Sequence, residues 1–113
     1  MTRQLIIGDR VISDDSDAYV IAEIGHNHQG SLKRAKELFQ AAAECGVSAA
    51  KLQKRDNRGL FTRAAYEKPY DNENSFGATY GEHREALEFG KTEYTELQAE
   101  SGRLGLHLDE RRC

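Results

Sequence analysis

The sequence predicts an α/β fold in which short buried β-strands alternate with amphipathic helices. Residues 19–53 hold a strand, a polar loop, a helix, a tight turn and a second strand, which is the spacing of a βαβ unit. The first strand is apolar on both faces, as is typical of a parallel sheet. Because βαβ crossovers join parallel strands, we expect a parallel sheet or a barrel.

Each early element has a sequence signal at its ends. Two apolar runs joined by a Gly-Asp pair predict a β-hairpin over about 4–13. The first parallel strand is predicted over 19–24. Ser31 is placed to cap the helix that follows, and Gly46 is placed to end it. The second strand is predicted over 47–53.

The second half of the chain is less regular. Residues 54–89 are rich in turn residues, with short helical patches near 63–67 and 82–88. A connection this long inside a compact α/β unit is more often functional than idle. Helical periodicity resumes over 91–104, with Thr92 as a candidate cap.

Gly105 is predicted to end that last helix, and a third strand should follow it. The apolar residues stop at Leu108, however, and only charged residues and Cys113 come after them. We therefore expect βα units over about 19–106 and an unfinished third strand.

Composition excludes several classes of protein. The 113 residues are 38% hydrophobic and carry a formal net charge of −3, so a nucleic-acid partner is not expected. No apolar run approaches the roughly 20 residues that cross a membrane, and no signal peptide is expected at the N-terminus. Cys45 and Cys113 form neither a disulfide framework nor a metal-binding spacing, which predicts a reduced, cytoplasmic setting.

Polar residues in the predicted strands are the first candidates for a site, since α/β proteins place their sites at the carboxyl ends of parallel strands. Glu23 interrupts an apolar strand, where a buried carboxylate would need a partner. Lys51 and Gln53 are two residues apart, so they share a face of the second strand. A structural ion pair and the floor of an anion site both fit this pattern.

The loops offer two further candidates. His26 and His28 are close enough to share a metal, but no third ligand stands at a supporting spacing, so hydrogen bonding or substrate contact is the better interpretation. Lys54, Arg55 and Arg58 form a small basic cluster. This cluster fits a solvated loop, or a site that attracts a phosphate or carboxylate.

Three ordered stretches carry a family resemblance. They are IAEIGHNHQG at 21–30, KLQKR at 51–55, and FGATYGEHR with ALEF inside 76–89. Together they resemble the N-terminal part of the sialic acid synthase (N-acetylneuraminate synthase) family, over most of residues 4–106. The resemblance implies an N-terminal β-hairpin plus the first βα units of a (β/α)8 TIM barrel.

The resemblance also implies a truncated chain, because such a barrel takes about 250 residues. On this interpretation residues 1–113 are an N-terminal fragment, cut short or shifted in reading frame near its end, and the family's C-terminal antifreeze-like domain is absent. Full-length relatives are expected to be homodimers.

The activity implied by the resemblance is an enzymatic condensation. Phosphoenolpyruvate joins an N-acetylmannosamine-type sugar with release of phosphate, and a divalent metal, Mn2+ or Mg2+, serves as cofactor. The family's metal ligands lie further along, so no metal-binding residue is expected in this chain, which would be inactive alone. The alternative is a non-catalytic α/β binding module for phosphoenolpyruvate or a sugar acid.

Site residues carry over only at matching positions. Glu23 matches a catalytic glutamate placed against the reacting carbons. Lys51 matches a lysine that holds phosphoenolpyruvate, and Gln53 matches a glutamine that faces the sugar. Asn27, His28 and Tyr80 are expected only to shape the site.

Overall fold

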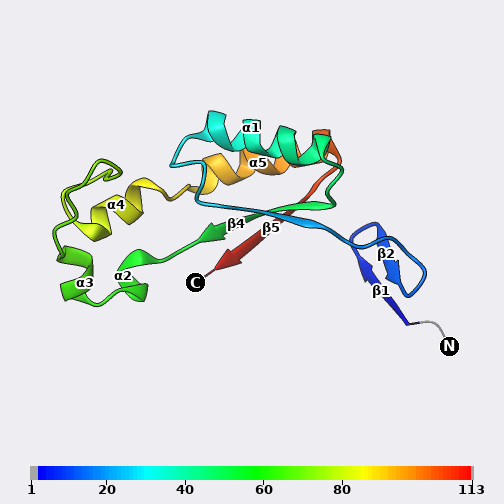
Figure 1. The fold of residues 1–113 in the computed structure, drawn as a ribbon, viewed down its shortest axis with the longest axis horizontal. Helices are drawn as coiled ribbons and strands as arrows, with labels where there is room; N and C mark the ends of the chain where they lie inside the picture. The colour runs from blue at the N-terminus through cyan, green and yellow to red at the C-terminus, as the bar shows by residue number, and fades with distance from the viewer. Residues whose placement is uncertain (1–2, 113) are drawn as a thin grey trace.

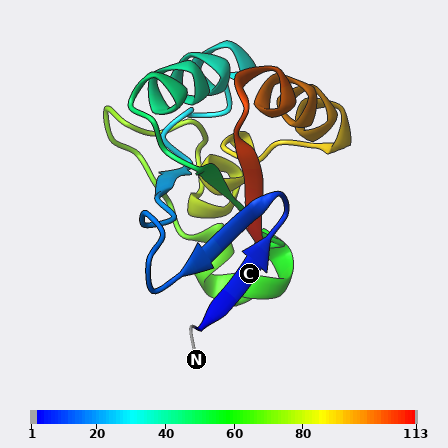
Figure 2. The same cartoon turned by 90° about the vertical axis from the view of Figure 1, so that its right-hand side faces the viewer.

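A parallel sheet with two helices on one face forms the centre of the molecule (Figures 1 and 2). The computed structural model describes residues 3–112, with side chains as far as Asp109. Strands β3 (Ile21–Gly25), β4 (Ala49–Lys54) and β5 (His107–Arg112) pair in the order β3-β4-β5. Helices α1 (Leu32–Glu44) and α5 (Lys91–Leu104) lie side by side over them. Within residues 3–112, no helix lies on the other face of the sheet.

The N-terminal hairpin forms as predicted. Strands β1 (Gln4–Ile7) and β2 (Arg10–Ser13) pair antiparallel around a two-residue turn. The hairpin lies beyond the amino ends of the parallel strands (Figure 1). His107 links it to the sheet, with Nε2 2.7 Å from Asp9 Oδ1 and Nδ1 2.6 Å from the Tyr19 hydroxyl.

The predicted signals at the ends of α1 are confirmed. The Ser31 hydroxyl accepts the Arg34 backbone N–H at 3.1 Å, and Gly46 has a left-handed φ of +81°. The predicted range of α5, 91–104, is confirmed, but its predicted cap is wrong, because Gly90 occupies the cap position and no described side chain caps the helix. Thr92 therefore lies inside the first turn, whereas the predicted end at Gly105 is confirmed.

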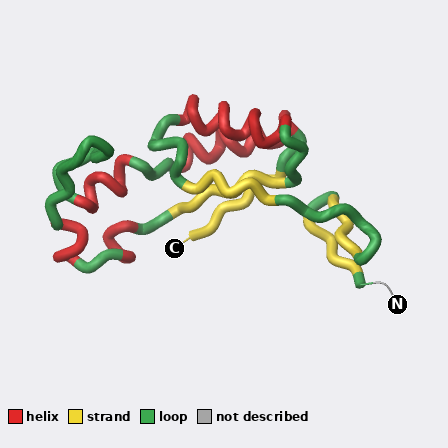
Figure 3. Tube along the Cα trace, in the orientation of Figure 1, coloured by secondary structure: helices red, strands yellow, loops and turns green. Residues whose placement is uncertain are grey.

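The segment between β4 and α5 is partly helical and lies beyond the carboxyl ends of the strands (Figure 3). Its helices are α2 (Asn57–Leu60), α3 (Arg63–Glu67) and α4 (Tyr80–Ala86). The sequence predicts the last two approximately and misses α2, a single turn that the Asp56 carboxylate caps at the Gly59 N–H, 3.3 Å away.

The expectation of an unfinished third strand is wrong. β5 runs parallel to β4 along its whole length, from Ala49 opposite His107 to Lys54 opposite Arg112. Backbone hydrogen bonds hold this pairing, and they do not require apolar side chains. The charged residues after Leu108 therefore belong to the strand.

Alternation along the strands separates a covered face from an open face. The core lies between the sheet and the helices, together with Phe89 from the connecting segment. Its buried members are Ile24, Ala35, Phe39, Ala50, Leu52, Phe89, Leu97 and Leu106. Residues at the alternate positions point away from the helices and form the open face, defined here as Ile21, Glu23, Ala49, Lys51, Gln53, His107 and Asp109. Within residues 3–112, no helix is long and apolar enough to cross a membrane.

Candidate functional site

Glu23 and Lys51 meet on the open face. They are register partners on the neighbouring strands β3 and β4, and the Lys51 Nζ lies 3.1 Å from Glu23 Oε2. The Glu23 side chain is 50% exposed, so the expectation of a buried carboxylate is wrong. The carboxylate sits on the side of the strand that no helix covers, where an ionised group retains much of its hydration.

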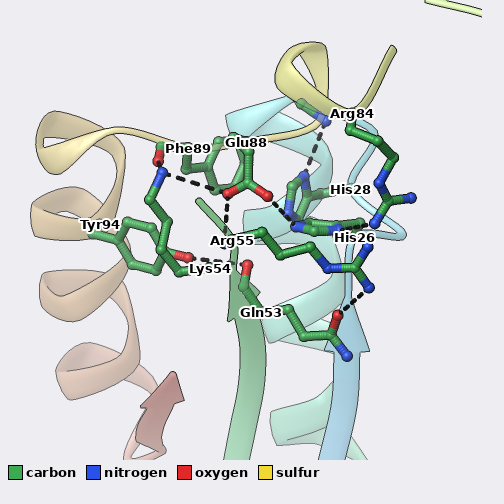
Figure 4. Close-up of polar contacts among 10 residues, drawn as sticks. His26, His28, Gln53, Lys54, Arg55, Arg84, Glu88, Phe89 and Tyr94 are labelled. Carbon is green, nitrogen blue, oxygen red and sulfur yellow. Dashed lines mark hydrogen bonds and ion pairs between the residues drawn. The ribbon is translucent and has the colours of Figure 1, made fainter. Parts of the chain in front are cut away.

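Gln53 extends this face toward the carboxyl end of β4. It lies two residues beyond Lys51, and its side-chain oxygen accepts a hydrogen bond from the Arg55 guanidinium at 2.9 Å (Figure 4). The Tyr94 hydroxyl donates to the Gln53 backbone carbonyl at 3.3 Å. The structure thus places all three principal candidates on one face of two adjacent strands.

Asn27 and His28, the two predicted site-shaping residues in the loop after β3, both make contacts that stabilise this loop. The Asn27 side-chain amide donates to the Ile24 carbonyl at 2.8 Å, which closes the turn. His28 is 1% exposed and stacks on Phe89 with ring centroids 3.9 Å apart. Its Nδ1 accepts the Gly30 backbone N–H at 3.0 Å.

Burial also determines the charge of His28. Loss of hydration, with a smaller contribution from the nearby His26, lowers the pKa of His28 from 6.5 to about 4. The ring is therefore neutral at pH 7, in agreement with an Nδ1 that acts as an acceptor.

Tyr80 packs within the connecting segment. Its ring makes edge contacts with Phe61 and Tyr70, at centroid distances of 5.1 Å and 5.5 Å, and it also approaches His83. None of these partners belongs to the open face. The described contacts thus assign Tyr80 to an aromatic cluster that holds α4 against the preceding loop.

A second polar group lies beside Gln53 and was not predicted as a unit. We call it the Glu88 cluster, and it comprises His26, Lys54, Arg55, Arg84 and Glu88 (Figure 4). The Glu88 side chain is only 7% exposed. Its carboxylate lies 3.1 Å from His26 Nε2 and 3.4 Å from the Lys54 Nζ, and it accepts the Arg55 backbone N–H at 3.3 Å.

His26 joins the two ends of this cluster. Arginine can only donate, so the 3.3 Å contact between the Arg84 guanidinium and His26 Nδ1 makes Nδ1 an acceptor and leaves the proton on Nε2, beside Glu88. Burial lowers the pKa of His26, while the Glu88 carboxylate opposes that shift. The basic residues after β4 were visible in the sequence, and Glu88 lies in the ALEF stretch, but nothing in the sequence indicated their contact because 33 residues separate Glu88 from Arg55.

The donor set does not fit a resident metal. Within the described part of the chain, no group of three or more His, Cys, Asp or Glu side chains is arranged to hold a metal ion. His26 and His28 are both engaged, the first by Arg84 and Glu88 and the second by Gly30.

Sequence comparison identifies the family and several relatives of this chain. Residues 38–108 match the NeuB family. The N-acetylneuraminate-9-phosphate synthases of Mus musculus and Homo sapiens are 42% and 43% identical to this chain over 97 residues, which are 86% of this chain and 27% of each relative. The N,N'-diacetyllegionaminic acid synthase of Legionella pneumophila is 34% identical over 91 residues, or 80% of this chain and 26% of that protein.

Two solved structures share the fold. One is the N-acetylneuraminic acid (sialic acid) synthetase of Leptospira borgpetersenii, crystallised with citrate, with a TM-score of 0.70 and 24% identity over 99% of this chain and 35% of that one. The other is the spore coat polysaccharide biosynthesis protein SpsE of Bacillus subtilis, with a TM-score of 0.67 and 23% identity over 98% of this chain and 28% of that one. The predicted hairpin and first βα units are confirmed, and the chain spans about a quarter of the curated relatives' length.

Proposed function

Because this chain belongs to the NeuB family, we propose that it supplies the N-terminal part of a synthase barrel that condenses phosphoenolpyruvate with an N-acetylmannosamine-type sugar. In this proposal residues 1–113 form one unit, with the hairpin at about 4–13 and the βα units at about 19–106. The names of the relatives support a nonulosonic acid product, and the mouse and human relatives are named for a 9-phosphate.

One observation carries the proposal. Glu23 and Lys51 are in contact on the open face, and Gln53 lies on the same face two residues after Lys51 on β4. In a closed barrel the open face would be the interior, and the carboxyl ends of its strands form the active-site rim. A cation, a carboxylate and an amide on that side are the groups that an anionic donor and a polar acceptor require.

Each side chain then has a defined task. The Lys51 ammonium offsets the negative charge of phosphoenolpyruvate, and Glu23 holds that ammonium in place at 3.1 Å. The Gln53 amide offers hydrogen bonds to the sugar. In this proposal Glu23 is the catalytic carboxylate that faces the donor's reacting carbons, as the family resemblance implies.

Water is the one reagent that the reaction needs besides the two substrates. C3 of phosphoenolpyruvate forms a bond to the aldehyde carbon of the open-chain sugar, whose oxygen takes up a proton. Water adds at C2, and the tetrahedral intermediate collapses to the 2-keto acid as the C2–O bond to phosphate breaks. A divalent metal would polarise the aldehyde in the complete family fold, but the described residues of this chain do not form a site for it.

A chimera tests the proposal. Residues 4–108 would replace the matching segment of the mouse N-acetylneuraminate-9-phosphate synthase, and phosphate release would be measured with both substrates. We expect Lys51→Ala to abolish release, whereas Lys33→Ala, at an exposed position of α1, leaves it unchanged. Unaltered turnover in the Lys51→Ala chimera would overturn the assignment.

The chain alone tests the binding-module alternative. We expect the 113-residue protein to bind phosphoenolpyruvate through Lys51 and to release no phosphate from it. If the chimera is also inactive while the chain binds saturably, a non-catalytic binding module is the better description.

A further inference from the structure

The Glu88 cluster contains more positive than negative charge. Its cations are Lys54, Arg55 and Arg84, and its one carboxylate is Glu88. Glu88 contacts the Lys54 ammonium, the His26 ring and a backbone N–H, so it does not pair with either guanidinium. Among the side chains described, through Asp109, no carboxylate lies within 4.0 Å of the Arg55 or Arg84 guanidinium.

Neutral acceptors hold the two guanidinium groups instead. Arg55 donates to the Gln53 amide oxygen at 2.9 Å, and Arg84 donates to His26 Nδ1 at 3.3 Å. The Nε atoms of both arginines are buried and have no hydrogen-bond partner within the described residues. Because a guanidinium offers five N–H donors, each arginine is oriented while several of its donors remain unused.

The two guanidinium groups also repel one another. In Figure 4 both lie on the same side of His26, away from the Glu88 carboxylate. Burial lowers the pKa of Arg84, and the charge of Arg55 lowers it further. Two like charges, one just past β4 and one on α4, are held together at a cost that an anion between them would offset.

From this arrangement we propose that Arg55 and Arg84 bind the phosphate group of a phosphate monoester, in a site separate from Lys51. The Lys51 ammonium pairs with Glu23, whereas the Arg55 guanidinium contacts Gln53 and the Arg84 guanidinium contacts His26, so the lysine and the arginine pair have different partners. Gln53 lies between Lys51 and Arg55 in the sequence and contacts Arg55 directly.

Two compounds could supply this phosphate group, and both are named as candidates because of the proposed function. One is a phosphorylated sugar whose phosphate binds the arginine pair while its other end faces Gln53. The other is phosphoenolpyruvate itself. Both present the same dianionic group, which guanidinium donors recognise by paired hydrogen bonds.

The test is a titration of the 113-residue chain with inorganic phosphate at constant ionic strength. Binding would be followed by the urea midpoint and by the NMR resonances of the arginine Nε–H groups. We expect phosphate to raise the midpoint and to shift the Arg55 and Arg84 resonances. Arg84→Gln and Arg55→Gln should each weaken binding about 10- to 100-fold, the value of a charged hydrogen bond.

The matched control is Arg63→Gln, because the Arg63 side chain is 90% exposed and pairs with Glu67. It should leave phosphate binding unchanged. If a glutamine variant loses its dispersed spectrum, Arg84→Lys and Arg55→Lys preserve the charge but remove the paired geometry, and they should still weaken binding. Wild-type affinity in these variants, or no effect of phosphate on the chain, would overturn the proposal.

Further arms identify the source. Titrations with N-acetylmannosamine 6-phosphate and with phosphoenolpyruvate would be repeated in Arg84→Gln and in Lys51→Ala. If the binding of one ester is lost in Arg84→Gln but kept in Lys51→Ala, the result supports the second site and identifies that ester as the source of the phosphate group. Loss of both esters and of inorganic phosphate in Lys51→Ala, with Arg84→Gln unaffected, would overturn the second site and leave the proposed function standing.

Discussion

The two faces of the β3–β4–β5 sheet have different roles. The covered face packs the hydrophobic core, and the open face carries the charged candidate site. On the covered face Leu52 is fully buried against α1 and α5. On the open face its neighbour Lys51 pairs with Glu23, whose side chain is half exposed. Because side chains alternate along a strand, a shift of one residue exchanges the two sets. The packing of the covered face therefore fixes where the open-face residues point.

The largest effect should come from the covered face. Phe39 on α1 is fully buried, so Phe39→Ala should cost about 3–5 kcal/mol of the free energy of unfolding. The matched open-face variant, Ile21→Ala, removes a side chain that is 47% exposed and should cost about 1 kcal/mol or less. Urea unfolding of the chain measures both. Similar losses would contradict the division between the faces.

His28 gives the covered face a pH dependence. Its pKa is about 4 in the folded chain and 6.5 when unfolded, so the unfolded chain binds the extra proton between these values. Stability should be complete above pH 6.5 and should fall by up to about 3 kcal/mol as the pH decreases to 4. The buried His26 and His83 have lowered pKa values too, and they contribute with the same sign.

The His28 prediction is checked by urea unfolding as a function of pH. His28→Gln keeps a hydrogen-bond acceptor but cannot titrate, so its stability curve should be flatter than that of the wild-type chain between pH 4 and 6.5. Parallel curves for the two proteins would show that another group causes the loss.

Substitution of two glycines tests the close contact between the loop after β3 and the end of α4. Gly30 and Gly46 both have a left-handed φ, +78° and +81°. A Cβ on Gly30 would lie 2.3 Å from the Ala86 backbone oxygen, whereas a Cβ on Gly46 meets nothing within 4 Å. Both substitutions to alanine carry the backbone cost, so Gly30→Ala should cost about 1–3 kcal/mol more in urea unfolding. Equal costs for the two variants would show that Gly30 and the Ala86 backbone oxygen are not in close contact in solution.

The sequence predicted the covered face better than the chemistry around it. Local signals determine the hairpin, α1 and the end of α5, because capping residues and apolar spacing act over a few residues. Ser31 and Gly105 are examples. β5 was misjudged because its charged residues are held by backbone pairing with β4, which side-chain polarity does not report.

The site was predictable only where strand register brings its residues together. Glu23 and Lys51 meet because β3 and β4 are sequential parallel strands, and the spacing of a βαβ unit implies such pairing. The Glu88 cluster depends on how residues 55–89 fold back over the ends of the strands. No periodic pattern in the sequence fixes that path, so the partnership of His26 with Glu88 and Arg84 was missed.

The smallest effect on stability should come from the open face itself. The Glu23–Lys51 pair is partly exposed, and such pairs contribute about 0–1 kcal/mol, so Lys51→Met should shift the urea midpoint only slightly. Binding should respond differently, because removal of the ammonium leaves phosphoenolpyruvate without its cation on the open face, and calorimetric titration should show weaker association than with the wild-type chain. Lys33→Ala serves as the control, since it removes an exposed positive charge on α1, away from the open face. A large loss of stability in Lys51→Met, with binding retained, would mean that the pair belongs to the architecture of the sheet rather than to a ligand site.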